Sequence, residues 1–154
     1  MEWSAVISNP LFENLPFKIE LNKWGKVLMS PANNHHGRLQ YQVGKLIDRH
    51  KNHGEIIMEC SIKTVDGVKV ADLAWASDAF VKEYGYDTPY LRAPEICVEI
   101  VSPSNIQHEI EEKIQLYLDQ GAIEVWIVSQ DGSTNYFNNN GKMISSNEVS
   151  ISKP

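Results

Sequence analysis

The sequence predicts an α/β domain in which a mixed β-sheet is flanked by helices. The first observation is the order of elements, because the patterning gives strands, a helix, strands, a helix and a strand along the chain. The second is a strand–helix–strand unit at residues 95–129, where two apolar runs enclose a helical segment. The third is the length of 154 residues, which suits a single domain, residues 1–154, with one sizeable core.

The N-terminal half predicts a strand pair and a long helix. Residues 17–30 have the pattern of two short strands joined by a turn near residues 22–25. Residues 35–54 predict a helix that ends near Gly54. Its core-facing stripe recurs at the helical period and consists of Leu39, Val43, Leu46 and Ile47.

The rest of the chain predicts a hairpin followed by the strand–helix–strand unit. Residues 55–77 have the pattern of two strands joined by an Asp66-Gly67 turn. A short helix capped by Ser77 follows the second strand. The remaining expected elements are a loop at residues 85–94, a strand at 96–101, a helix at 106–120, a strand at 122–129 and a hairpin at 136–144, after which the tail is expected to be weakly ordered.

Composition narrows the class of protein. The formal charge of −6 counts against a broad, nonspecific nucleic-acid surface, although it leaves room for a local basic cleft. The apolar runs are too short to span a bilayer, and the N-terminus lacks the basic segment of a signal peptide. Cys60 and Cys97 have no metal or disulfide spacing and read as reduced core residues. We therefore expect a cytoplasmic protein with no membrane contact.

Glu99 is an ionisable residue in a strand that is otherwise apolar. The segment ICVEIV at residues 96–101 contains one charged side chain among five apolar ones. A carboxylate is almost never fully buried unless it is paired or bound to a metal. Glu99 also lies near the C-terminal end of its strand, where open α/β sheets commonly place their sites. The sequence therefore predicts partners for this carboxylate.

Asp72 and Lys113 are charged residues in similar positions. Asp72 lies in mid-strand on the face that it shares with small residues, which leave room for a ligand or an ion. Lys113 lies on the core-facing stripe of the helix at residues 106–120, so it needs an anionic partner. Two carboxylates and one ammonium group thus point toward the same layer of the protein.

This trio suits metal-assisted hydrolysis of a phosphodiester bond. Mg²⁺ prefers carboxylate oxygens and keeps several waters. Such an ion polarises a phosphate and lowers the pKa of bound water, and a nearby lysine can orient that water or offset charge in the transition state.

Structural explanations for the same residues remain open at this point. Lys113 could extend to the surface from the edge of its stripe. Glu99 and Lys113 could form a purely structural buried pair. Asp72 would be a turn residue if the strand register were shifted by one position.

Several segments together resemble the Uma-type (Uma2, DUF820) putative restriction endonuclease family of the PD-(D/E)XK nuclease superfamily. The segments that carry the resemblance are ADLAW, PEICVEIVSPSN, EEKIQLYLDQGAIEVWIV and, upstream, ELNKWGKVLMSPANNHHGRL. The resemblance covers residues 17–137. It implies a restriction-endonuclease-like fold with that core and a Mg²⁺- or Mn²⁺-dependent nuclease that acts on DNA.

The resemblance also implies roles for particular residues. Asp72 and Glu99 match the two motif acids that hold the metal, and the backbone carbonyl of Val101 is a further expected ligand. The superfamily lysine usually lies two residues after the second acid, where this chain has Val101, and the family supplies it from the next helix as Lys113. Glu20 matches an upstream glutamate that is expected near the metal. Ala71 stands where proline is usual, which the chemistry does not require.

Two further residues are candidates for substrate contact. His36 matches the histidine that opens a helix in the family, and a helix cap or local hydrogen bond fits it better than a phosphate contact. Ser102 lies in the turn after the Glu99 strand.

The expected function is cleavage of DNA, and two rivals remain. The first is a domain of the same fold that binds nucleic acid or a protein without cutting, which the acidic balance favours. The second is a structural ion pair in an interaction protein. A homodimer is one way for so small a domain to reach both DNA strands.

Overall fold

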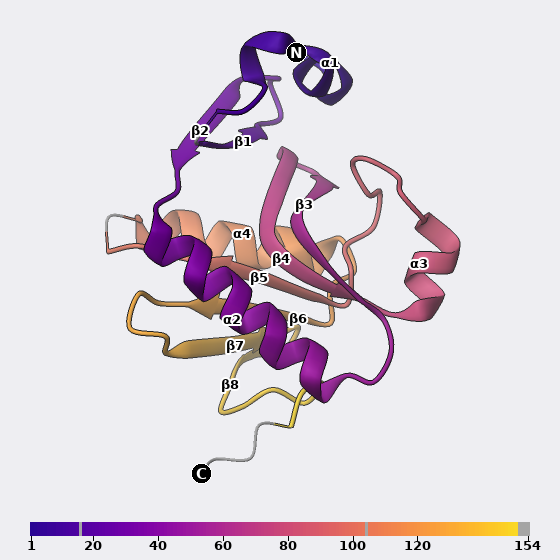
Figure 1. The fold of residues 1–154 in the computed structure, drawn as a ribbon, viewed down its shortest axis with the longest axis vertical. Helices are drawn as coiled ribbons and strands as arrows, with labels where there is room; N and C mark the ends of the chain where they lie inside the picture. Colours follow the sequence, from indigo (N-terminus) through magenta and orange to yellow (C-terminus); the bar gives the residue numbers. More distant parts are fainter. Residues whose placement is uncertain (16, 104, 151–154) are drawn as a thin grey trace.

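A computed structural model describes residues 1–15, 17–103 and 105–150. The chain begins with a short helix, α1 (Trp3–Ser8), and one 3-10 turn, η1 (Pro10–Phe12). The expected strand pair follows as β1 (Phe17–Leu21) and β2 (Val27–Pro31), which pair antiparallel. These two strands form a separate two-stranded sheet above the main sheet (Figure 1).

The main sheet is mixed, as the sequence predicts. Its six strands lie in sequence order, and the only parallel neighbours within the described residues are β5 and β6. The other neighbours pair antiparallel. The strands are β3 (Glu55–Thr64), β4 (Gly67–Ala76), β5 (Ile96–Ile100), β6 (Glu124–Val128), β7 (Thr134–Asn138) and β8 (Gly141–Met143).

Helices cover both faces of this sheet. Helix α2 (Asn34–His50) packs its apolar stripe against one face, where Ile47 lies in a core cluster with Leu73 and Val98. Helices α3 (Asp78–Tyr84) and α4 (Gln107–Asp119) cover the other face with Phe80 and Tyr117. Helix α4 forms the crossover connection between β5 and β6, which parallel strands require.

Two element boundaries differ slightly from expectation. Helix α2 ends at His50 rather than near Gly54, because Lys51 already takes an extended backbone conformation. The β3–β4 turn is formed by Val65 and Asp66, and Gly67 already pairs with Thr64. A Cβ on Gly67 would collide with the backbone at the end of β1, so glycine lets the hairpin tip touch the small sheet. This contact places β1 over the main sheet.

The tail, which we expected to be weakly ordered, makes specific contacts with the main sheet at residues 146–149. The buried Glu124 carboxylate accepts hydrogen bonds from the Ser146 hydroxyl and from the backbone N–H groups of Asn147 and Glu148. Val149 is only 1% exposed and belongs to the same core cluster as α2. A buried acceptor and one apolar anchor thus dock the segment. Residues 151–154 lie outside the described part of the chain.

Candidate active site

Adjacent strands bring the two predicted acids side by side. Strands β4 and β5 pair antiparallel with Leu73 opposite Val98, so the next step along this register brings Asp72 beside Glu99. Both residues are buried, with exposures of 1% and 4%. Two neighbouring buried carboxylates repel each other, so they need donors or cations.

Asp72 is held by three donors. Its Oδ2 accepts a hydrogen bond of 2.7 Å from the Ile100 backbone N–H. Its Oδ1 lies 3.1 Å from the Lys18 Nζ and 3.3 Å from the His36 Nε2. Although burial opposes the charged form, these donors and the Lys18 charge lower the pKa of Asp72 well below its ordinary value. Asp72 is therefore an anion at neutral pH.

Glu99 has a different electrostatic balance. Its Oε1 accepts from the Tyr117 hydroxyl at 2.6 Å and lies 3.3 Å from the Lys113 Nζ, and its Oε2 lies 2.9 Å from the Lys18 Nζ. Burial raises the pKa of Glu99 despite the opposing effect of Lys113 and Lys18. Glu99 is thus the more readily protonated acid of the pair, and its charge depends on the cations around it.

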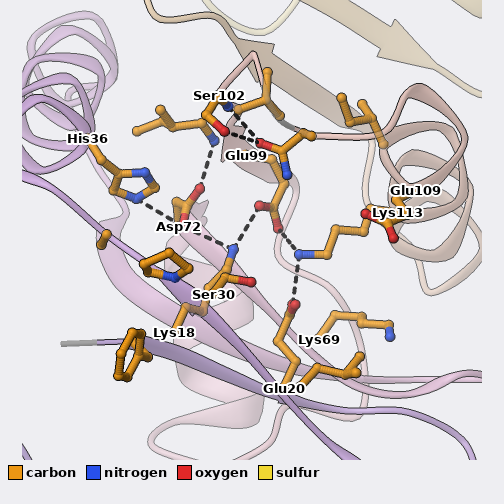
Figure 2. A pocket seen from close by; sticks show the side chains of 18 of the residues that line it. Lys18, Glu20, Ser30, His36, Lys69, Asp72, Glu99, Ser102, Glu109 and Lys113 are labelled. Atoms are coloured by element: carbon orange, nitrogen blue, oxygen red, sulfur yellow. Dashed lines mark hydrogen bonds and ion pairs between the residues drawn. The ribbon is translucent and has the colours of Figure 1, made fainter. Parts of the chain in front are cut away.

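Lys18 is the main residue that the sequence reasoning missed. Its Nζ lies between Asp72 and Glu99 (Figure 2) and also donates to the Val70 carbonyl at 3.0 Å. Burial opposes its charge, but Glu99 and Asp72 raise its pKa well above the ordinary value. Alternation along β1 puts Lys18 on the same side as Glu20, and this was the signal that could have identified it.

Glu20 and Lys113 complete the cluster. The Lys113 Nζ lies 2.8 Å from Glu20 Oε2 and 3.3 Å from Glu99 Oε1, so it bridges these two acids. Glu20 also accepts from the Val70 backbone N–H at 2.7 Å. Burial disfavours its charge, but Lys113 and Lys18 lower the pKa of Glu20. The fold thus brings Glu20, Asp72, Glu99 and Lys113 together.

The β3–β4 ladder opens beside Asp72. The β3–β4 register skips Glu59 and Asp72, and Glu59 takes a left-handed φ of 51°, which is uncommon for a residue other than glycine. The Gln40 side-chain amide donates to the backbone carbonyl of Asp72 and to Glu59 Oε1. A side chain of helix α2 therefore supplies the hydrogen bond that β3 does not make to Asp72. No sequence pattern signalled Gln40 or Glu59.

The remaining predicted residues lie on the edge of the cluster. The Val101 carbonyl accepts from the Gln130 side-chain amide at 3.1 Å. The Ser102 hydroxyl lies 3.1 Å from Asn105 Oδ1. His36 points at Asp72, and this hydrogen bond raises the pKa of His36 despite its partial burial. The helix cap is the Asn33 side chain, which accepts from the His36 N–H, so His36 does not cap α2.

The cluster lies in a cleft of about 860 Å³. One wall comes from the β1–β2 hairpin and exposes apolar side chains that include Phe17 and Met29. The opposite wall comes from α4 and carries Glu109 and Glu112. His36 and Asn33, at the start of α2, close a third side. Buried charges at the base of an open cleft are typical of a functional site.

The donor chemistry fits a divalent cation. Asp72 Oδ1 and Glu99 Oε2 both face one positive atom, the Lys18 Nζ, and carboxylate oxygens are the donors that Mg²⁺ prefers. Within the described residues, no group of three or more His, Cys, Asp or Glu side chains is arranged to hold a metal ion. A metal here would therefore have two carboxylate ligands and would complete its shell with water or carbonyl oxygens, as Mg²⁺ commonly does.

The fold defines a restriction-endonuclease-like α/β domain with paired carboxylates and lysines in its cleft. The chain matches the family model of the putative restriction endonucleases, Uma2, over residues 10–141. The protein therefore belongs to the Uma2 family, and this membership supports a nuclease-like function.

A solved structure gives an independent comparison of the fold. A crystal structure of a putative nuclease belonging to DUF820 from Anabaena variabilis is similar to this chain with a TM-score of 0.65. The two sequences are 17% identical, and the similarity covers 85% of this chain and 83% of the other. No curated protein sequence matches the chain. No helix in the described part of the chain has both the length and the apolar character needed to cross a membrane.

Proposed function

We propose that this protein is an endonuclease that hydrolyses phosphodiester bonds in DNA with the help of Mg²⁺ or Mn²⁺. One observation carries the proposal: Asp72 and Glu99 direct one oxygen each at the same positive atom, the Lys18 Nζ, at the base of the cleft. Family membership and the fold support the same reaction class.

The metal ligands would be Asp72 Oδ1 and Glu99 Oε2, with the Val101 carbonyl as a further donor and Glu20 nearby. When bound, the ion would polarise the phosphate and lower the pKa of a water molecule. Tyr117 and Lys113 both hold Glu99 Oε1, so Oε2 faces the position that the Lys18 Nζ occupies. Asp72 is fixed in the same way by the Ile100 N–H. The site is thus oriented before any ligand arrives.

Lys113 is the candidate for the group that acts on the attacking water. Its side chain is 22% exposed, so its ammonium group is accessible from the cleft while it contacts Glu20 and Glu99. In this role it would orient the nucleophile and offset charge that develops on the phosphate.

Helix α2 offers a path for the DNA backbone. The exposed residues Arg38, Lys45 and Arg49 fall on one stripe of the helix, on the side that points away from its buried stripe. None of the ion pairs among the described residues involves these three cations. The opposite wall of the cleft is acidic at Glu109 and Glu112, which would repel phosphates. We therefore place the flanking DNA over α2 rather than over α4.

A non-cleaving domain of the same fold is the second candidate. One observation favours it: Lys18 already pairs with both acids without a metal, so the ion pairs can serve as a structural network. Such a domain would bind nucleic acid or a protein partner and would leave it intact.

Cleavage assays separate the two functions. Supercoiled plasmid and single-stranded DNA are incubated with the protein in Mg²⁺, in Mn²⁺ and in EDTA. An endonuclease produces nicked or cut DNA in either metal and none in EDTA. DNA that is bound but intact in all three conditions would support the non-cleaving domain. The ratio of nicked to linear plasmid also reports whether a homodimer cuts both strands.

A further inference from the structure

Lys18 binds the two acids as a small cation would. Its Nζ lies 2.9 Å from Glu99 Oε2, 3.1 Å from Asp72 Oδ1 and 3.0 Å from the Val70 carbonyl. An ammonium group has three hydrogens, so these three acceptors satisfy it completely. The side chain is only 12% exposed, which means that water contributes little to its solvation.

The same position is the one that a metal shared by both acids would take with these side-chain orientations. Asp72 Oδ2 is occupied by the Ile100 N–H, and Glu99 Oε1 is occupied by Tyr117 and Lys113. Asp72 Oδ1 and Glu99 Oε2 are the two oxygens that face a common position, and Lys18 lies between them (Figure 2). Mg²⁺ binds carboxylate oxygens at about 2.0–2.1 Å, so the ion and the ammonium group cannot occupy this position together.

We propose that Lys18 is a built-in competitor for the metal, an inference that rests on the proposed function. In the metal-free protein its ammonium group holds Asp72 and Glu99 together and relieves their repulsion. As the metal binds, the ammonium group leaves the two oxygens and moves into the cleft, to which its four-carbon stem gives it access. Metal affinity is thus set below the value that the two carboxylates alone would give, by the free energy of displacing Lys18.

The geometry of β1 is consistent with this movement. Lys18 comes from the small sheet, whereas Asp72 and Glu99 come from the main sheet. The lysine can therefore withdraw without a change in the strands that carry the acids. The cleft volume of about 860 Å³ leaves room for the displaced side chain.

Lys69 provides a matched control. Lys69 also lines the cleft and is only 5% exposed. Its Nζ lies 3.2 Å from Asp66 Oδ2, and it has no ion pair with Asp72 or Glu99. Replacing Lys69 removes one cation from the same cleft and leaves the proposed metal position unchanged.

Calorimetric titration with Mn²⁺ alone tests the proposal on the full chain. Lys18→Met is compared with the wild-type protein and with Lys69→Met. Removing the competing charge should tighten Mn²⁺ binding by a factor on the order of ten or more. Lys69→Met should bind Mn²⁺ as the wild type does. Lys18→Gln, which is neutral and keeps a hydrogen-bond donor, is measured in parallel and should also bind more tightly.

The outcomes distinguish this inference from the proposed function. If the wild type binds Mn²⁺ and both Lys18 variants bind equally or more weakly, Lys18 is no competitor, and the metal site itself stands. If neither the wild type nor the Lys18 variants bind Mn²⁺, the inference and the metal-dependent function fail together. If both Lys18 variants fail to fold even in saturating Mn²⁺, a metal cannot replace the ammonium group, and the inference is overturned.

Discussion

The Glu99 carboxylate is costly to bury in the fold and is also a candidate functional group. It is buried in a central strand, where an isolated carboxylate would be costly. One hydrogen bond and two ion pairs offset this cost, and they come from Tyr117, Lys113 and Lys18. The same partners orient its Oε2 toward Asp72, so the contacts that permit burial also prepare a cation position.

The first prediction at this scale concerns metal-linked stability. Mn²⁺ should raise the melting temperature of the wild-type protein, because a ligand that binds only the folded state stabilises it by mass action. Asp72→Asn and Glu99→Gln should each abolish the rise. The exposed Glu83→Gln on α3 is the control and should keep it. An equal rise of the melting temperature in all four proteins would show that Mn²⁺ does not bind at Asp72 and Glu99.

The second prediction concerns Lys113. Lys113→Met keeps the length and the apolar stem of the side chain but removes its charge. This variant should fold and bind Mn²⁺, and single-turnover cleavage should fall by a factor on the order of 10² or more. Lys113→Arg should also lose activity, because a planar guanidinium does not replace a compact ammonium group.

Stability measured on the Lys113→Met variant distinguishes a structural role of Lys113 from a catalytic one. Without the Lys113 ammonium group, Glu20 keeps the hydrogen bond from the Val70 N–H and the nearby charge of Lys18. A purely structural Lys113 would give a variant with lower stability and near-normal cleavage in the folded fraction. That result would refute its role at the reacting phosphate.

At the scale of elements, local pattern explains most of what could be predicted. The strand–helix–strand unit and the β3–β4 hairpin follow from short-range periodicity and turn residues, and the structure confirms them. Register then follows from alternation, which is why Asp72 and Glu99 could be placed on a shared layer. The docked tail was missed because its anchor, Glu124, lies more than twenty residues upstream, in β6.

Lys18 marks the limit of this reasoning. It lies 54 residues from Asp72 and 81 residues from Glu99 in the sequence. Its place in the cluster depends on a separate small sheet that Gly67 allows to touch the β3–β4 hairpin. No local pattern encodes that contact, so alternation with Glu20 along β1 was the one sequence signal that could have linked Lys18 to the site.

Helix α2 carries the prediction at the element scale. Replacing Arg38, Lys45 and Arg49 with Gln should weaken DNA binding by a factor on the order of ten or more. The slope of log binding constant against log salt concentration should become less steep by about 2 to 3. Binding is measured in the Glu99→Gln background so that DNA stays intact. The matched control replaces the exposed Lys63, Lys82 and Lys142 with Gln, which changes the net charge equally. Equal losses in the two triple variants would mean that α2 is no DNA path.

At the scale of the whole molecule, an acidic chain can still serve an anionic substrate. The formal charge is −6, yet Lys18, Lys113 and Lys69 line the cleft together with its acids, and α2 carries further cations on its exposed face. A divalent ion would add positive charge at the centre. Substrate recognition would then depend on local charge rather than on net charge.

Single-turnover cleavage of supercoiled plasmid in Mn²⁺ tests the central claim most directly. Wild type, Glu99→Gln and the surface control Glu83→Gln are compared after melting curves show that each is folded. We expect wild type and Glu83→Gln to nick or linearise the plasmid at similar rates, and Glu99→Gln to be slower by a factor on the order of 10² or more. Cleavage by Glu99→Gln at the wild-type rate, or no cleavage by folded wild type, would contradict the assignment of Asp72 and Glu99 as a nuclease centre.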